Sequence, residues 1–140
     1  MLGKTVKEIN VNDTGSFTKS VTEYDVYSFA GVTGDMNPVH INKEFAGESV
    51  FGERIVHGIL SIGFISNVLG TQIPGPGAIY LKQECSFLKP VYIGDTITAN
   101  VEVTRKDEGK NRVWLHTYCT NQRQEVVIDG EAIMMPRKDA

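Results

Sequence analysis

The chain has 140 residues, of which 41% are hydrophobic and 22% charged, and its formal net charge at pH 7 is −3. This balance is typical of a globular protein rather than a disordered one, and we expect a single domain over residues 1–140. The longest basic runs are the pairs Arg105-Lys106 and Arg137-Lys138, which argues against nucleic acid or an anionic membrane as the main partner.

Two cysteines, Cys85 and Cys119, lie far apart in apolar stretches, and we expect both to be buried free thiols. There is no CxxC or Cys/His cluster, so the sequence predicts no metal site. Residues 1–12 lack the apolar core of a signal peptide, and no apolar run approaches the ~18 residues of a membrane span. We therefore expect a protein of the reducing cytoplasm.

The first predicted elements are a strand over residues 16–21 and a helix that follows it. Thr22 and Asp25 have the spacing of a capping box, which predicts that the helix begins at Thr22. Apolar residues then recur at helical spacing as far as Gly34, where a C-terminal cap is expected. Pro38 disfavours helical geometry at the residue before it, so the segment after Gly34 is predicted to be a turn.

Next come a short helical turn, expected over residues 42–47, and a loop over 48–54. Residues 57–69 then place apolar side chains all round a second helix, which is expected to end at Gly70. A helix that is apolar on every side is typical of the centre of a domain.

After a loop over residues 71–77 the apolar period changes from that of a helix to two, which predicts strands. Four strands are predicted, at residues 78–90, 97–103, 113–119 and 126–135. The connections between them are short, as in an antiparallel sheet. We therefore expect an α+β architecture in which a curved sheet wraps around helix 57–69.

One segment concentrates groups that can transfer protons. Gly34-Asp35-Met36-Asn37-Pro38-Val39-His40 carries a carboxylate, an amide and an imidazole on a turn that Pro38 makes rigid. A carboxylate and a histidine held near each other can act as a general acid and base. The alternative is that Asp35 and Asn37 only form the turn and that His40 is an ordinary loop histidine.

This run resembles the signature of the MaoC-like (R)-specific enoyl-CoA hydratases. In that family, Gly/Ser-Asp-x-Asn-Pro-x-His precedes a Val-His-Gly sequence, and here Val56-His57-Gly58 follows at the family's spacing. The glycine-rich turn and strand at residues 74–81, and the Pro-Val and Gly-Asp hairpin at 87–95, are also similar to the family pattern. The resemblance covers residues 5–135.

The resemblance implies a hotdog fold, an antiparallel sheet wrapped around a long helix. It also implies a homodimer with an acyl tunnel near the shared interface. The implied reaction adds water reversibly to a trans-2-enoyl-CoA and yields the (R)-3-hydroxyacyl-CoA. Asp35 and His40 would share the proton transfers, and we hypothesise that His40 is the base and Asp35 the donor to C2. No bound cofactor is implied, because coenzyme A arrives as part of the substrate.

Supporting roles fall on further residues. The amide of Gly58, in the first turn of the buried helix, is the candidate donor to the thioester oxygen. Asn37 either orients the two proton-transfer groups or only forms the turn. Ser66 matches a family serine at the acyl pocket, although a serine inside a helix also bonds its own backbone. With Leu69, it is expected to shape that pocket, while His57 either contacts the substrate or only holds the loop before the helix.

Two alternatives to a hydratase are a thioesterase and a non-catalytic acyl-CoA-binding protein. A thioesterase with this fold typically carries its carboxylate on the long helix, and residues 57–69 contain no acidic residue. A non-catalytic acyl-CoA-binding protein would have no use for the set Asp35, Asn37, His40 and Gly58. The sequence does not decide the length of the acyl chain, nor whether coenzyme A or acyl carrier protein carries it.

Overall fold

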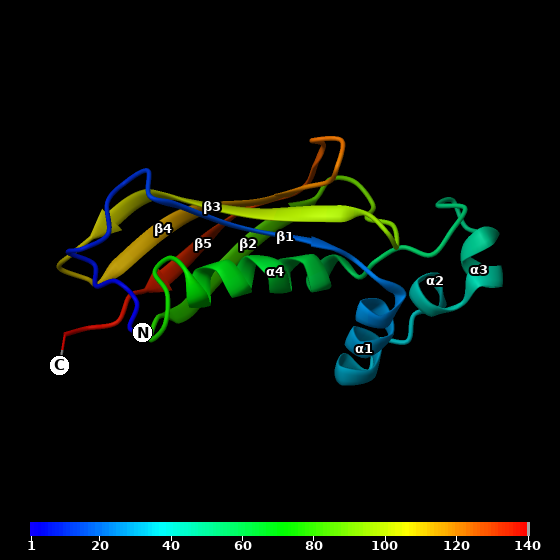
Figure 1. Ribbon diagram of the computed structural model, residues 1–140, viewed down its shortest axis with the longest axis horizontal. Coiled ribbons are helices and arrows are strands. Elements are labelled where there is room, and N and C mark those ends of the chain that lie inside the picture. Colours follow the sequence, from blue (N-terminus) through cyan, green and yellow to red (C-terminus); the bar gives the residue numbers. More distant parts are fainter. Residues whose placement is uncertain (140) are drawn as a thin grey trace.

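The computed structural model describes residues 1–139, and its centre is a five-stranded antiparallel sheet wrapped over one long helix (Figure 1). The strand order is β1-β3-β4-β5-β2. The strands are β1 (Thr14–Ser20), β2 (Ile79–Phe87), β3 (Thr96–Asp107), β4 (Arg112–Thr120) and β5 (Val126–Met135), and the helices are α1 (Glu23–Thr33), α2 (Pro38–Ile41), α3 (Lys43–Gly47) and α4 (Gly58–Thr71). The predicted α+β arrangement is confirmed.

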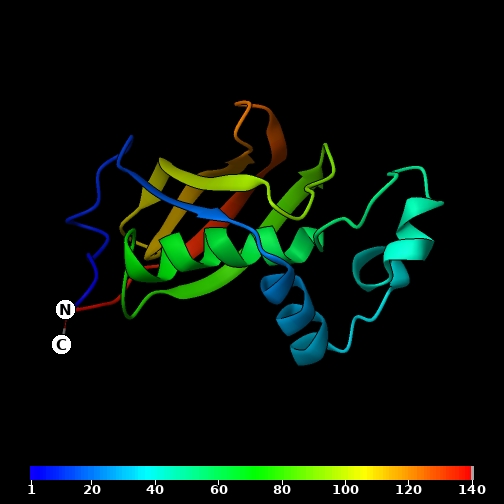
Figure 2. The same ribbon diagram turned by 45° about the vertical axis from the view of Figure 1, so that its right-hand side comes forward.

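Helix α4 lies along one face of the sheet, while α1, α2 and α3 project together beyond one end (Figures 1 and 2). Residues of β3 and β4 alternate between the helix side and the outer side, as the period of two predicts. The core between sheet and helix is apolar, and its fully buried members include Ile65, Val68, Leu69, Ile97, Val101, Val103, Val113 and Leu115. None of the helices in residues 1–139 is both long and apolar enough to span a membrane.

Helix α4 is buried against the sheet as predicted, but its opposite face is open in the single chain. Gly63, Ser66 and Gly70 are exposed, and the side chain of Ile59 is 59% exposed. The physical reason is that one sheet covers only one face of a helix, and the opposite face of α4 has no second layer over it (Figure 1). An apolar helix face left open in this way is typical of a surface that another part or copy of a protein covers.

The predicted limits of α1 are confirmed. The Thr22 hydroxyl accepts a hydrogen bond from the Asp25 backbone N–H at 3.2 Å, and the Asp25 carboxylate accepts one from the Thr22 N–H at 2.9 Å. At the other end Gly34 adopts a φ of 80°, a conformation that glycine reaches without steric cost. The chain therefore leaves α1 in a fixed direction just before Asp35.

Several boundaries differ from the sequence prediction, and three of the differences have a clear physical reason. Helix α4 runs through Gly70 to Thr71, because the N–H of Gln72 still reaches the carbonyl of Val68 at 2.9 Å. Strand β2 ends at Phe87 and not at residue 90, since Pro90 has no N–H to donate to a neighbouring strand. Residues 38–41 form a short helix instead of part of a turn, because proline suits the first helical position and Asn37 caps it.

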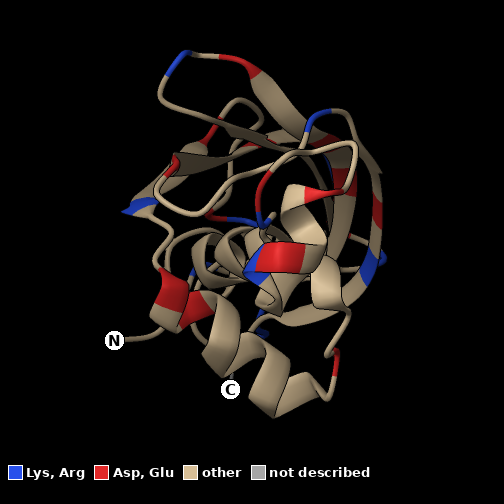
Figure 3. Cartoon of the chain, turned by 90° about the vertical axis from the view of Figure 1, so that its right-hand side faces the viewer, with Lys and Arg blue, Asp and Glu red and all other residues tan. Residues whose placement is uncertain are grey.

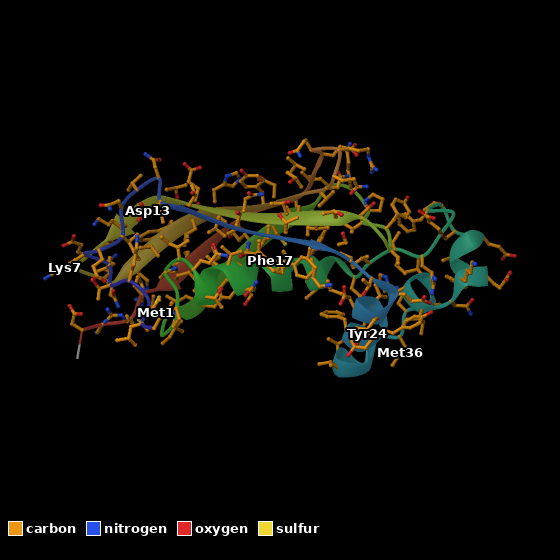
Figure 4. All side chains as sticks on the ribbon, viewed as in Figure 1. Met1, Lys7, Asp13, Phe17, Tyr24 and Met36 are labelled. Atoms are coloured by element: carbon orange, nitrogen blue, oxygen red, sulfur yellow. The ribbon has the colours of Figure 1, made fainter. Side chains whose placement is uncertain are left out.

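The end of the molecule that carries the projecting helices shows more acidic than basic segments (Figure 3), and α1 contains Glu23 and Asp25 but no lysine or arginine. Apolar side chains are also exposed there: Tyr24 and Met36 lie on the outer side of this projection, whereas Phe17 of β1 points toward α4 (Figure 4). Phe17 packs edge-on against Phe64 of α4 with ring centroids 5.7 Å apart. This contact holds β1, and with it the start of α1, against the central helix.

Candidate active site

His40 is a buried imidazole with a defined tautomer. It lies in α2 and is only 8% exposed. Its Nδ1 lies 2.7 Å from the carbonyl oxygen of Ile55, a pure acceptor, so Nδ1 carries the proton and donates it. This leaves Nε2 as an unprotonated acceptor, which is the form a general base requires.

The surroundings of His40 also favour its neutral form. Burial is the largest cause and lowers the pKa of His40 from its ordinary value, and the neighbouring His57 acts in the same direction. The Ile55 carbonyl and the Asp35 carboxylate act in the opposite direction without reversing the shift. His40 is therefore able to accept a proton at pH values below those at which an ordinary histidine can.

Asp35 lies directly after the helix cap Gly34 and is exposed in this chain. Its carboxylate accepts a hydrogen bond from the Asn37 N–H at 3.2 Å, and the Asn37 side chain caps α2 by accepting from the Val39 N–H at 3.3 Å. One side-chain ligand atom from each of Asp35, His40 and His57 lies within 4.8 Å of the others. That spacing allows a single water molecule to bridge the carboxylate and an imidazole.

The same three residues make a poor metal site. The rings of His40 and His57 are stacked, with centroids 3.8 Å apart and planes inclined by 26°. Imidazole nitrogens bind metals in the plane of the ring, and two nearly parallel rings do not direct their lone pairs at one ion.

Helix α4 presents its N-terminus to this cluster. His57 is the N-cap residue and is 2% exposed, and its Nε2 lies 3.1 Å from the backbone carbonyl oxygen of Asp35. Gly58 is the first helical residue, and its N–H forms no hydrogen bond with any residue from 1 to 139. A free N–H at the positive end of a helix is a natural donor to a negatively charged oxygen.

Two cavities meet at this point. One has a volume of about 310 Å³, with mainly apolar walls and Lys89 as its one lysine or arginine among the described residues. The other is about 270 Å³ and includes Asp35, His57 and Ile59. His40 and Gly58 line both cavities, so a molecule bound in either one lies next to both residues.

Comparison with known proteins agrees with this geometry. The sequence model of the family described as "MaoC like domain" matches residues 6–123. The chain belongs to the MaoC-like family. It is 49% identical over 92% of its length to the (R)-specific enoyl-CoA hydratase of Rhodospirillum rubrum, of which it covers 89%.

Comparison with solved structures supports the fold assignment as well. The unliganded R-hydratase of Pseudomonas aeruginosa superposes with a TM-score of 0.92 at 41% identity, covering 98% of this chain and 88% of that one. The (R)-hydratase of Aeromonas caviae gives a TM-score of 0.89 at 38% identity, covering 91% of this chain and 97% of that one. The hotdog fold of this MaoC-like chain is thereby confirmed.

The structure brings five of the seven predicted site residues together and leaves two apart. Asp35, Asn37, His40, His57 and Gly58 gather where the turn after α1 meets the N-terminus of α4. Ser66 lies about two turns further along α4 on its exposed face, and Leu69 is fully buried against the sheet. Neither Ser66 nor Leu69 lines the two cavities in the single chain, and their contact with an acyl group stays a prediction.

Two contributors to the site were missed from the sequence. The carbonyl of Ile55 sets the tautomer of His40, and a backbone contact between residues 15 apart leaves no residue-type signal. The ring of Phe87 lies against the backbone of Gly58, where an added Cβ would be 2.6 Å from the Phe87 Cδ1. Phe87 belongs to the family-like segment 87–95, but its side chain could be assigned to this contact only from the structure.

This contact predicts a difference between two helical glycines. Gly58→Ala should destabilise the protein by about 1 kcal/mol, because the new methyl group must displace the half-exposed Phe87 ring. Gly31→Ala in α1 meets nothing within 4 Å among the described residues and should stabilise the protein by roughly 0.5–1 kcal/mol, through its higher helix propensity. Chemical denaturation of the two variants measures both effects, and equal stabilities would contradict the packing of Phe87 on Gly58.

Proposed function

We propose that this chain is an (R)-specific enoyl-CoA hydratase, which adds water reversibly to trans-2-enoyl-CoA to give (R)-3-hydroxyacyl-CoA. The observation that carries the proposal is the position of the Asp35 and His40 side chains within 4.8 Å of each other, beside the free N–H of Gly58. Relatives named for the two directions of this reaction support it. Besides the hydratase of R. rubrum, a protein of Methylorubrum extorquens named 3-hydroxybutyryl-CoA dehydratase is 42% identical over 95% of this chain and 85% of its own length.

His40 is the proposed base. Because its Nδ1 donates to Ile55, its Nε2 is free to take a proton from a water molecule held between His40 and Asp35. The water oxygen then bonds to C3 of the substrate, and the electron pair of the C2=C3 bond moves toward the thioester oxygen. A positioned base typically accelerates such a step by a factor of ~10²–10⁴.

Gly58 is the proposed donor to the thioester oxygen, on which negative charge develops. Its N–H is fixed by the helix and already lacks a protein partner, so it needs no rearrangement to donate. The 14 residues of α4 direct the positive end of the helix dipole at the same place. As the carbonyl re-forms, Asp35 in its carboxylic acid form gives a proton to C2, and the proton that His40 took from the water returns to the Asp35 carboxylate to complete the cycle.

Asn37 is proposed to orient Asp35 through its N–H and to start α2 through its side chain, so that Asp35 and His40 keep a fixed separation. Lys89 in the larger cavity supplies a positive charge where the anionic coenzyme A can approach, although it pairs with Glu125 in the free chain. Ser66 and Leu69 are proposed to shape the acyl pocket.

We also propose that the chain is one domain over residues 1–140, acts in the cytoplasm and forms a homodimer. Within residues 1–139 the edge strand β2 pairs only with β5, and it exposes Ile79 and Leu81. The exposed face of α4, with Ile59 and Ser66, lies next to the site. A second copy that covers this face would enclose the acyl group and exclude water from Asp35.

The carrier of the acyl group is an open part of the proposal. A mitochondrial protein of Arabidopsis thaliana, named 3-hydroxyacyl-[acyl-carrier-protein] dehydratase, is 36% identical over 94% of this chain and 80% of its own length. The cavities accept the thioester end of a substrate and do not distinguish the two carriers. We propose coenzyme A, since the R. rubrum and M. extorquens relatives are named for it.

The test is hydration of crotonyl-CoA, followed by the loss of enoyl-thioester absorbance. We expect rapid loss, with a product that an (S)-specific 3-hydroxyacyl-CoA dehydrogenase does not oxidise. Crotonyl-acyl carrier protein, run in parallel, decides the carrier. Release of free thiol without hydration would instead support a thioesterase, and no reaction with either thioester would contradict the proposal.

A further inference from the structure

His57 contacts every part of the candidate site that carries chemistry. Its ring stacks on the ring of His40, and its Nε2 donates to the backbone carbonyl of Asp35 at 3.1 Å. It is also the N-cap of α4 and therefore the residue directly before Gly58. A third ring, that of Phe29 in α1, lies with its centroid 4.8 Å from that of His57.

These contacts join segments that are distant in the sequence. Asp35 and His40 lie in the turn and short helix after α1, whereas Gly58 begins α4 about twenty residues later. The contacts of His57 link the backbone at Asp35, the imidazole of His40 and the first turn of α4. His57 therefore acts on the separation of the carboxylate, the imidazole and the N–H of Gly58, together with the backbone contacts that Ile55 makes with His40 and Val39.

Packing alone does not require histidine at this position. The Nδ1 of His57 is buried and has no hydrogen-bond partner among the residues that the structure describes. A buried polar atom without a partner destabilises a fold, and a phenylalanine of similar volume would avoid that loss. The feature that phenylalanine lacks is the Nε2–H that bonds the Asp35 carbonyl.

We propose that His57 is a positioning residue, which holds Asp35 and His40 at the separation that shared proton transfer requires. The inference rests on the proposed hydratase function and deepens it, because it assigns to His57 an action on the two proton-transfer groups rather than on the substrate. The stack restricts the rotation of the His40 ring, while the hydrogen bond fixes the backbone that carries the Asp35 side chain.

The stack has an electrostatic consequence for His40. The titratable side chains that line the two cavities with it are Asp35, His57 and Lys89. Burial is the largest cause that lowers the pKa of His40. The neighbouring imidazole of His57 lowers this pKa as well, whereas the Asp35 carboxylate raises it. Removal of the second imidazole should therefore raise the pKa of His40, a change that a loss of packing elsewhere in the core would not produce.

The test compares the wild type with His57→Phe, which keeps a buried ring and removes the hydrogen bond. We expect kcat for crotonyl-CoA to fall by ~10², as for a misplacement of about 1 Å, while KM changes little. The acidic limb of the pH profile of kcat/KM should move to higher pH, since this limb reports the base of the free enzyme. His57→Gln, which has an N–H to offer to Asp35 but no ring, serves as the second variant.

A measurement without substrate separates this inference from the proposed function. The chain has three histidines, so an NMR titration follows His40 individually in each variant. We expect the pKa of His40 to rise in His57→Phe. Leu115→Ala, which opens a cavity in the core, should lower the unfolding temperature without moving the pKa of His40.

Two results would overturn the positioning role. One is a His40 titration that is the same in the wild type and in both His57 variants. The other is a folded His57→Phe enzyme whose kcat and acidic limb match the wild type. If the wild type hydrates neither crotonyl-CoA nor its acyl carrier protein thioester while the titration shifts as expected, the function fails and the coupling between the two histidines stands.

Discussion

His40→Gln is expected to lower kcat for crotonyl-CoA hydration by ~10²–10⁴, the usual contribution of a positioned general base. Glutamine can still donate to the Ile55 carbonyl from its amide, so the local backbone should be kept. It has no atom that accepts a proton near neutral pH, so the water is no longer activated. The rate of loss of enoyl-thioester absorbance at saturating substrate measures the effect.

The matched control is His116→Gln. His116 lies on β4, is half-exposed, and pairs with Asp129 at 2.6 Å, away from both cavities. An exposed pair of this kind contributes at most about 1 kcal/mol to stability, and activity should be unchanged. If His40→Gln were as active as His116→Gln, His40 would not be the base.

The same assignment fixes the direction of the pH dependence. A base acts only when it is neutral, and burial lowers the pKa of His40 below the ordinary histidine value of about 6.5. The acidic limb of kcat/KM should therefore lie below pH ~6.5, with activity lost as the pH falls through the pKa of His40. A limb above that value would contradict the buried, neutral histidine.

The sequence predicted those parts of the fold that depend on local rules. The capping box of Thr22 and Asp25 and the left-handed Gly34 set the limits of α1, and the period of two gave β3 and β4. Gly70 was misinterpreted because a glycine ends a helix only where the backbone turns left-handed, and there the helical hydrogen bond from Gln72 continues. Whether α4 ends at Gly70 or continues through it depends on how the helix packs against the sheet, which is not a local property of the sequence.

The candidate site shows the same division. Asp35 and His40 are close in sequence, so the rigid turn at Pro38 already predicted that they act together. Their approach to Gly58 depends on backbone contacts such as that of the Ile55 N–H with the Val39 carbonyl at 3.2 Å. Backbone groups are the same in every residue, so neither this contact nor the one that sets the tautomer of His40 could be predicted from residue types.

Asp35→Asn should lower kcat by ~10²–10⁴ as well, with little change in the unfolding temperature. Asparagine is of the same size and keeps the oxygen that accepts from the Asn37 N–H, so the turn before α2 should persist. What is lost is the proton that the carboxyl group gives to C2. Circular dichroism melting beside the hydration assay separates a chemical loss of this kind from a loss of fold.

The double variant Asp35→Asn/His40→Gln decides whether the two residues work as a unit. Both side chains contact one water and one substrate in a single proposed step. Once either side chain has been replaced, replacing the other should therefore lower kcat much less than the first replacement did. A double variant slower by the full product of the two single losses would mean that Asp35 and His40 act in separate steps. A kcat close to that of the wild type in Asp35→Asn alone would remove the carboxylate from the mechanism and leave His40 and Gly58 as its only chemical groups.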